Sequence, residues 1–250
     1  MNINIISYEE IDSTNVEVTR LSEQGAPEGT VVVAKAQTAG RGRRGRSWAS
    51  PKGEALYMSL LLRPSFATDK ASALTLVMAI AVRETIGELV QSGCYIKWPN
   101  DIVINGKKVC GILTEMTLQG SEIGHVVIGV GVNVNQLDFA NELADTATSL
   151  RLETGKAVEQ LALLDRVLYY FERNYEVFLR TCDMRELVDK YNQLLVNCGK
   201  EVRVLDPKGD FEGVAQGINE TGELLVKKYS GELVAVYAGE VSVRGIYGYT

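Results

Sequence analysis

The chain has 250 residues, of which 46% are hydrophobic and 23% charged, and its formal net charge is -6. This composition is typical of a folded globular protein and excludes fibrous and disordered classes. The longest apolar run, residues 74–82, is far shorter than the ~20 residues that a membrane-spanning helix needs. The N-terminus lacks the basic and apolar regions of a secretory signal, so we expect a cytoplasmic protein with no membrane contact.

Cysteine and histidine positions argue against a zinc site and against a disulfide framework. The four cysteines are widely separated, and the single histidine, His125, has no second histidine with which to share a metal. Charge is distributed unevenly along the chain. Residues 1–110 contain 13 basic and 11 acidic side chains, whereas residues 111–250 contain 13 and 21. We therefore expect the basic charge of the first half to serve a local purpose.

The first part of the chain predicts a helix, two strands and a longer helix. Asp12-Ser13-Thr14-Asn15 offers capping residues for a helical stretch that ends near Gly25. Residues suited to pleated, buried positions then predict strands over 30–37 and 55–62. Over 69–91 apolar residues recur every three or four positions, which predicts a helix with one face packed on a sheet.

The second part predicts strands, helices and then more strands. Residues 95–135 fit three or four strands, with Asn105-Gly106 as a two-residue hairpin turn. Helical spacing returns over 158–179, and a further helix is expected over 184–196. After residue 199, short strands alternate with turn sequences about every ten residues, which predicts a small all-β barrel.

The loop from Gly40 to Trp48 carries four arginines within six residues. It matches the glycine spacing of a dinucleotide-binding turn, but the residues after it, including Pro51, do not open a helix. Glycines allow backbone amides to approach an anion, and guanidinium groups suit carboxylate or phosphate, so the loop favours a phosphorylated ligand. A solvated basic turn and a nucleic-acid patch are the alternatives, although the acidic chain as a whole weakens the second.

Two further segments carry residues suited to binding a nucleotide. Lys97-Trp98-Pro99-Asn100-Asp101 precedes a hairpin with Lys107, Lys108 and Gly111, and Asp101 could bind Mg²⁺ together with a polyphosphate. The plain alternative is a surface strand end with a hairpin salt bridge. In residues 129–135 glycines alternate within a strand pattern, which indicates close approach of a ligand or a bulge.

In this order, the segments resemble the biotin protein ligase family over nearly the whole chain. The motifs are Asp12-Ser13-Thr14-Asn15, Gln37-x-x-Gly40-Arg41-Gly42-Arg43-Arg44-Gly45-Arg46-x-Trp48, Lys97-Trp98-Pro99-Asn100-Asp101, Lys108-x-x-Gly111-Ile112-Leu113, Gly129-x-Gly131-x-Asn133, Ala147-Thr148-Ser149-Leu150 and Gly239-Glu240-x-x-x-Arg244. The resemblance implies an α+β fold. A mixed sheet flanked by helices, like the catalytic domain of class II aminoacyl-tRNA synthetases, would span 1–196, and an SH3-like β-barrel 197–250.

The resemblance implies a reaction in two steps. Biotin and MgATP give biotinyl-5'-AMP and pyrophosphate, and a lysine of the biotin carboxyl carrier protein of acetyl-CoA carboxylase, or of a related carboxylase, then takes the biotinyl group. Because the biotin carboxylate and the α-phosphate repel, neutralisation and positioning should supply most of the catalysis. Lys108 and Arg43 are the expected catalytic residues.

The resemblance also assigns residues to each substrate. The biotin-binding set is Ser13, Thr14, Asn15, Gln37, Gly40, Arg41, Gly42, Arg43, Lys108, Gly111, Leu113 and Gly129. The ATP-binding set is Arg43, Arg46, Trp48, Lys97, Asn100, Asp101, Asn133 and Arg244, with Asp101 as the Mg²⁺ ligand. Trp48 offers a ring for adenine, although it could equally be a core anchor. Glu240 and Arg244 would reach the nucleotide or the carrier protein.

Some members of the family carry an N-terminal DNA-binding domain, but here the first ligand motif begins at Ser13. We therefore expect an enzyme without sequence-specific DNA binding, and a homodimer is possible. We also expect ligand to order residues 40–48, because their like charges repel until anions arrive. The alternatives are a lipoate or octanoate ligase, which shares the acyl-adenylate chemistry, and a noncatalytic biotin-binding or nucleic-acid-binding module.

Overall fold

The computed structural model describes residues 1–48, 50, 52–140, 143–239, 242–245 and 249–250. Its centre is a seven-stranded sheet in the order β1-β2-β3-β7-β6-β5-β4, in which β1 and β2 are parallel and all other neighbours are antiparallel. The strands are β1 Asn4–Tyr8, β2 Thr30–Ala34, β3 Ala55–Leu62, β4 Cys94–Lys97, β5 Asp101–Ile104, β6 Lys107–Gln119 and β7 Glu122–Asn133. The sheet is therefore mixed, as the resemblance implied.

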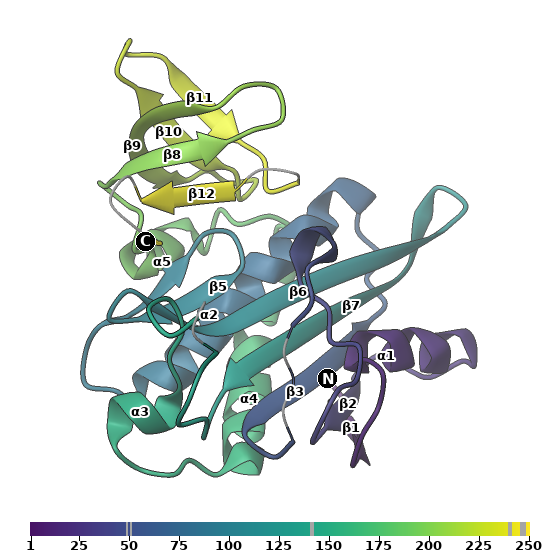
Figure 1. Ribbon diagram of the computed structural model, residues 1–250. Coiled ribbons are helices and arrows are strands. Elements are labelled where there is room, and N and C mark those ends of the chain that lie inside the picture. The colour runs from purple at the N-terminus through teal and green to yellow at the C-terminus, as the bar shows by residue number, and fades with distance from the viewer. Residues whose placement is uncertain (49, 51, 141–142, 240–241, 246–248) are drawn as a thin grey trace.

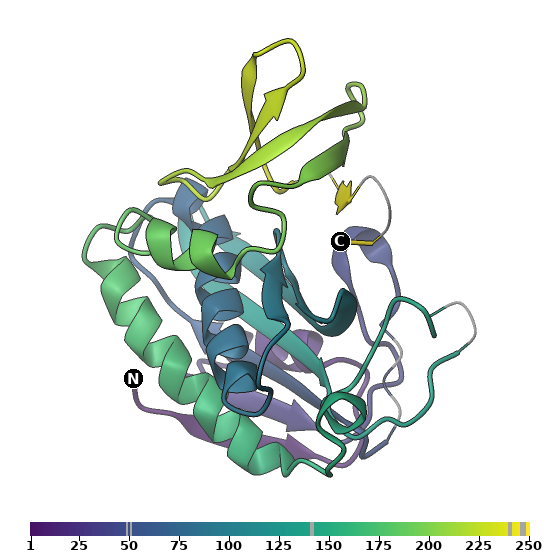
Figure 2. The same ribbon diagram turned by 90° about the vertical axis from the view of Figure 1, so that its left-hand side faces the viewer.

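Helices cover both faces of this sheet. On one face lie α2 (Leu74–Gly87) and α4 (Gln160–Leu179), side by side in Figure 2, and α1 (Thr14–Glu23) lies on the other face (Figure 1). Ten of the fourteen residues of α2 are buried, because it packs between the sheet and α4. Two short helices, α3 (Leu150–Thr154) and α5 (Val188–Leu194), complete this part of the chain. Among the described residues, no helix is long and apolar enough to cross a bilayer.

A second sheet follows α5 and stands at one end of the first (Figure 1). Its five antiparallel strands are ordered β11-β10-β9-β8-β12. They are β8 Glu201–Leu205, β9 Phe211–Ile218, β10 Leu224–Lys228, β11 Leu233–Val236 and β12 Ser242–Gly245. Within the described part of the chain the edge strands β11 and β12 are not paired with each other. There the domain is an antiparallel sheet rather than the closed barrel that the sequence predicted. The boundary at residues 196 and 197 stays a prediction.

Buried hydrogen bonds join the two sheets. The indole of Trp98 donates to the carbonyl of Gly222 at 3.1 Å, and the amide of Met184 donates to the carbonyl of Glu220 at 2.8 Å. Both carbonyls belong to the turn between β9 and β10. Trp98 is almost fully buried, so this part of the Lys97–Asp101 motif anchors the second domain. These hydrogen bonds hold the second domain, which includes β12 and Arg244, beside the first sheet.

Candidate active site

Two cavities meet on the face of the first sheet beneath the arginine loop. The smaller, of about 60 Å³, lies between α1, β6 and β7, and its lining includes every residue of the predicted biotin set except Gly40. The larger, of about 340 Å³, opens toward β12, and its lining includes the whole predicted ATP set. The residues that line both cavities are Gly42, Arg43, Trp48, Asn100 and Lys108. The geometry thus separates the two predicted sets and joins them at Lys108 and Arg43.

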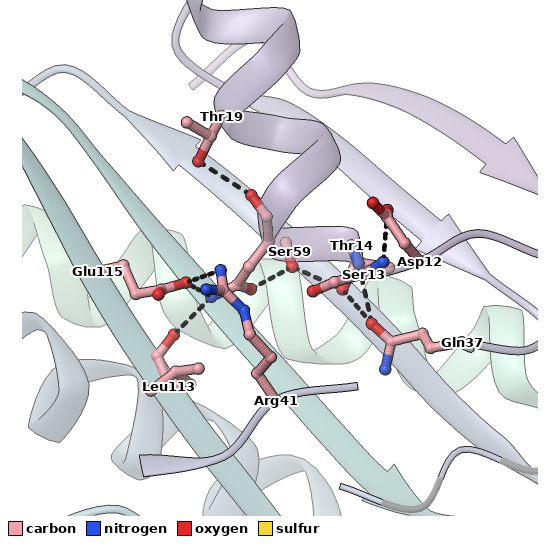
Figure 3. A network of polar contacts seen from close by, with 10 residues as sticks. Asp12, Ser13, Thr14, Thr19, Gln37, Arg41, Ser59, Leu113 and Glu115 are labelled. Carbon is pink, nitrogen blue, oxygen red and sulfur yellow. Dashed lines mark hydrogen bonds and ion pairs between the residues drawn. The ribbon is translucent and has the colours of Figure 1, made fainter. Parts of the chain in front are cut away.

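A chain of polar contacts lines the small cavity at the start of α1 (Figure 3). The backbone amide and the hydroxyl of Thr14 both donate to Oε1 of Gln37, at 2.9 and 3.1 Å. The hydroxyl of Ser59 lies 2.8 Å from Oγ1 of Thr14 and 2.6 Å from Oδ1 of Asn15. Thr14, Asn15 and Ser59 are buried, Gln37 is half-buried, and all four partner one another, so their orientations are fixed before a ligand arrives.

Asn15 is held from both ends of its amide. Its nitrogen donates to Oε2 of Glu115 at 2.7 Å and to the carbonyl of Leu113 at 3.3 Å, while its oxygen accepts from Ser59 (Figure 3). Gly129 on β7 faces that oxygen so closely that a Cβ atom there would lie 2.1 Å from it. Close packing against a side chain therefore favours glycine at residue 129, whereas the sequence had indicated a ligand or a bulge there.

The arginine loop spans both cavities. At its start, Arg41 forms a 3.1 Å ion pair with the same oxygen of Glu115 that binds Asn15 (Figure 3). The amide of Gly42 donates to the carbonyl of Arg46 at 2.7 Å, which folds the loop back on itself. Gly40 does not line the cavity, but a Cβ there would lie 2.5 Å from the carbonyl oxygen of Trp48, so this glycine closes the base of the loop.

Trp48 lies flat over two paired glycines. Gly111 on β6 and Gly131 on β7 are directly opposite in the sheet, and a Cβ on either would approach the indole to about 3.1 or 3.0 Å. The ammonium of Lys108 is 4.9 Å from the centre of the ring. The tryptophan therefore forms a wall between the two cavities, and stacking with adenine stays a prediction.

Arg43 connects the sheet with the second domain. Its guanidinium donates to Oδ1 of Asn100 at 3.1 Å and to the carbonyl oxygens of Ala238 and Gly239. Burial lowers the pKa of Arg43, but a guanidinium stays charged at any physiological pH. Asn100 is held in turn by its own donation to the carbonyl of Ile112 at 3.0 Å. A fixed positive charge is thus placed where the two cavities meet.

Lys108 lies at the same junction, opposite Asp101. Its Nζ is 2.6 Å from Oδ1 of Asp101, and its backbone bonds to residues 146 and 148 on either side. Those backbone bonds give the Ala147-Thr148-Ser149-Leu150 motif a clear role, which is to hold the strand that carries Lys108. Asn133 supports the same segment, because its amide donates to the carbonyl of Thr148 at 3.0 Å.

Lys97, Arg244 and Tyr249 also line the large cavity. Lys97 is only 6% exposed, and burial lowers its pKa to about 8. Tyr249 donates its phenolic hydrogen to Oδ2 of Asp101, and its ring lies 3.8 Å from the Lys97 ammonium. Burial, followed by the Asp101 carboxylate, raises the pKa of Tyr249, so the phenol remains a donor.

Asp101 suits Mg²⁺ that is held mainly by substrate phosphates. It is the one carboxylate on the lining of the large cavity in the described part of the chain. The described residues form no cluster of three or more metal-binding side chains, so the protein offers no cage of its own. Mg²⁺ is commonly bound through one or two carboxylates together with phosphate oxygens and water, and Asp101 fits that pattern.

Sequence reasoning missed three residues of this site. Ser59 is a lone polar residue in an apolar strand, and Glu115 is the one acidic residue of β6; both were visible as breaks in the hydrophobic pattern. Tyr249 gave no local signal, since only the fold brings it to Asp101. Glu240 lies outside the described residues, whereas Arg244 lines the large cavity.

Comparison with known proteins agrees with this geometry. Residues 8–133 match the biotin/lipoate A/B protein ligase family, and residues 198–244 match the biotin protein ligase C-terminal domain. The bifunctional ligase/repressor BirA of Bacillus subtilis is 38% identical over 97% of this chain and 75% of its own length. The biotin acetyl-CoA-carboxylase ligase of Paracoccus denitrificans is 33% identical over 94% of this chain and 98% of its own.

A solved structure shows the same architecture. The biotin protein ligase of Aquifex aeolicus, in complex with biotin and ATP, superposes with a TM-score of 0.83 at 34% identity, over 97% of this chain and 99% of that one. Sheet, site and matches together define a ligase of the biotin and lipoate class. The second matched domain narrows the class, and the chain belongs to the biotin protein ligase family.

Proposed function

We propose that this protein activates biotin with MgATP and transfers the biotinyl group to a lysine of a carrier protein. The observation that carries the proposal is the pair of joined cavities, whose linings divide into the biotin and ATP sets and share Lys108 and Arg43. Biotin occupies the small cavity beside Asn15, with its carboxylate at the junction. ATP occupies the large cavity, with its α-phosphate at the same junction.

In the first step a carboxylate oxygen of biotin attacks the α-phosphorus, and pyrophosphate leaves. The two reacting groups are anions, so their approach costs electrostatic free energy that nearby cations offset. Lys108 and Arg43 supply fixed positive charge to both, and Arg46, Lys97 and Arg244 face the other phosphates. Mg²⁺ held at Asp101 would add charge neutralisation on the phosphates.

In the second step the amine of the acceptor lysine attacks the acyl carbon, AMP leaves, and the nitrogen loses a proton. With biotin and AMP in place, the two cavities are filled, and the amine needs another route. A third cavity of about 290 Å³ reaches the junction, because its lining shares Arg43 and Asn100 with the others. It lies between the two domains and is lined by small residues such as Ser72 and Gly222. We assign it to the acceptor side chain.

Intact mass of a purified carrier domain, incubated with the protein, biotin and MgATP, tests the proposal. The carrier gains one biotinyl group only when both small molecules are present. Lipoate in place of biotin tests the second candidate, a lipoate ligase. If the carrier is modified with lipoate and not with biotin, the protein is a lipoate ligase instead. A carrier of unchanged mass would contradict ligase function.

A variant of the third cavity tests the acceptor route separately. Ser72→Trp fills it, so transfer should slow by roughly tenfold or more while biotin-dependent pyrophosphate exchange persists. Ala67→Trp is the matched control, because Ala67 is exposed and lies outside the lining. Equal loss of exchange and transfer in Ser72→Trp would contradict the assigned route.

Homodimer formation and a cytoplasmic location also belong to the proposal. Light scattering measures the first, and cell fractionation measures the second.

A further inference from the structure

The side chain of Tyr249 enters the nucleotide cavity from the end of the chain, although no motif of the site includes it. Its neighbour Thr250 folds back over the sheet. The oxygen of Thr250 lies so close to Gly245 that a Cβ there would be only 1.9 Å away, and its Oγ1 is 3.5 Å from the Cβ position of Gly106. Thr250 therefore packs between β12 and the β5–β6 hairpin, and its neighbour Tyr249 lines the cavity.

The phenol of Tyr249 fixes one oxygen of Asp101. The carboxylate is 9% exposed, and its other oxygen pairs with Lys108 at 2.6 Å. Lys108 must exchange this partner for the biotin carboxylate and the α-phosphate when the substrates bind. The Tyr249 hydrogen bond is made to the other oxygen, so it does not depend on Lys108 and would keep Asp101 from rotating once Lys108 turns toward the substrates.

The ring of Tyr249 acts on a second side chain of the cavity. The Lys97 ammonium lies 3.8 Å from the ring centre, within the range of a cation–π contact. The Asp101 carboxylate, which the Tyr249 hydroxyl holds, also acts on the Lys97 charge, so the tyrosine contacts both members of this pair. The face of the ring thus directs a buried cation toward the space that the phosphates would occupy.

We propose that Tyr249 is a positioning residue for MgATP, whose hydroxyl orients Asp101 and whose ring orients Lys97. The inference rests on the proposed function, because it assigns the large cavity to the nucleotide. Two variants distinguish the contribution of the hydroxyl from that of the ring. Tyr249→Phe removes the hydroxyl and keeps the ring over Lys97, whereas Tyr249→Leu removes both.

The test combines titration of MgATP into the full chain by calorimetry with biotin-dependent pyrophosphate exchange. For Tyr249→Phe, Kd and KM for MgATP should rise by roughly tenfold, the loss expected for one hydrogen bond to a charged group. The KM for biotin and kcat should stay within about twofold, since the small cavity is untouched. Tyr249→Leu should weaken MgATP further. Tyr229→Phe is the matched control, because the Tyr229 hydroxyl also donates to a carboxylate, that of Glu201 at 2.9 Å, outside the cavity.

Each other outcome overturns the inference. Tighter MgATP binding by Tyr249→Phe would mean that the phenol competes with the nucleotide for Asp101. Equal weakening of biotin and MgATP would indicate general damage to the site, and unchanged affinity would show that neither contact matters. If the unsubstituted protein lacks exchange, the proposed function fails on its own, while the calorimetric comparison still decides the role of Tyr249. No MgATP binding by the unsubstituted protein would overturn both.

Discussion

Nζ of Lys108 and Oδ1 of Asp101 lie 2.6 Å apart at the point where the two cavities meet. In the described lining of the large cavity, Asp101 is the one carboxylate among several cations. It reduces their mutual repulsion and keeps the lysine amine in place before anions arrive. Substrate anions then compete with Asp101 for Lys108, so the ion pair orients the lysine without removing it from the reaction.

Gly129→Ala should weaken the binding of biotin. The new methyl group would lie 2.1 Å from Oδ1 of Asn15, so the asparagine must leave its contacts with Glu115 and Ser59. Overpacking of this kind costs about 1–3 kcal/mol, and we expect biotin affinity to fall by roughly tenfold or more.

Isothermal titration with biotin measures this effect. Gly124→Ala is the control in the same strand, since the nearest atom to a Cβ there is the carbonyl oxygen of Thr117 at 3.3 Å. Unchanged biotin affinity in Gly129→Ala would show that Asn15 does not shape the biotin cavity.

Biotin and MgATP together should protect the arginine loop from trypsin. Trypsin cleaves after arginine, and the loop offers four sites within residues 41–46. Anions relieve the repulsion among these side chains, so the loop should become less accessible when both substrates are present. Cleavage after Lys208, in an exposed turn of the second domain, should continue at the same rate. Equal cleavage of the loop with and without substrates would contradict the expected ordering.

The ion pair between Asp183 and Arg185 should make stability depend on pH. The Arg185 hydrogen bond lowers the pKa of Asp183 to about 2. A carboxyl whose pKa is lower in the folded state stabilises above its unfolded pKa of about 4, and that contribution disappears as pH falls through the folded pKa. The unsubstituted protein should therefore exceed Asp183→Asn in free energy of unfolding at neutral pH, and the difference should shrink between about pH 4 and 2.

Urea unfolding across this range gives the difference directly. A constant difference for Asp183→Asn would show that the ion pair has no share in stability.

The predicted secondary structure agrees with the structure where apolar residues repeat with a clear period or a turn has a distinctive sequence. The strand predicted over 55–62 is β3, all eight of whose residues are buried. Asn105 and Gly106 adopt the positive φ angles of a tight hairpin turn, as their sequence indicated. The region 95–135 forms four strands, the upper end of the expected range.

Departures occurred where tertiary contacts decide the local structure. The helix predicted to begin at Asp69 starts with a 3₁₀ segment over Thr68–Ala73, and α2 begins only at Leu74. The helix expected from residue 184 begins at Val188, and the amide of Met184 bonds to the carbonyl of Glu220 in the second domain. Two short elements, β1 and α3, were missed; β1 is held by its parallel pairing with β2, which no local pattern reveals.

Pyrophosphate exchange tests the central claim most directly. The protein is incubated with labelled pyrophosphate, MgATP and biotin, and label in ATP is measured for the unsubstituted chain and for Lys108→Met. We expect exchange that requires biotin, does not occur with lipoate and falls by at least about a hundredfold in Lys108→Met, because the variant lacks the charge at the reacting centre. Exchange that persists at a similar rate in Lys108→Met, or that fails in the unsubstituted protein although biotin binds, would contradict the claim.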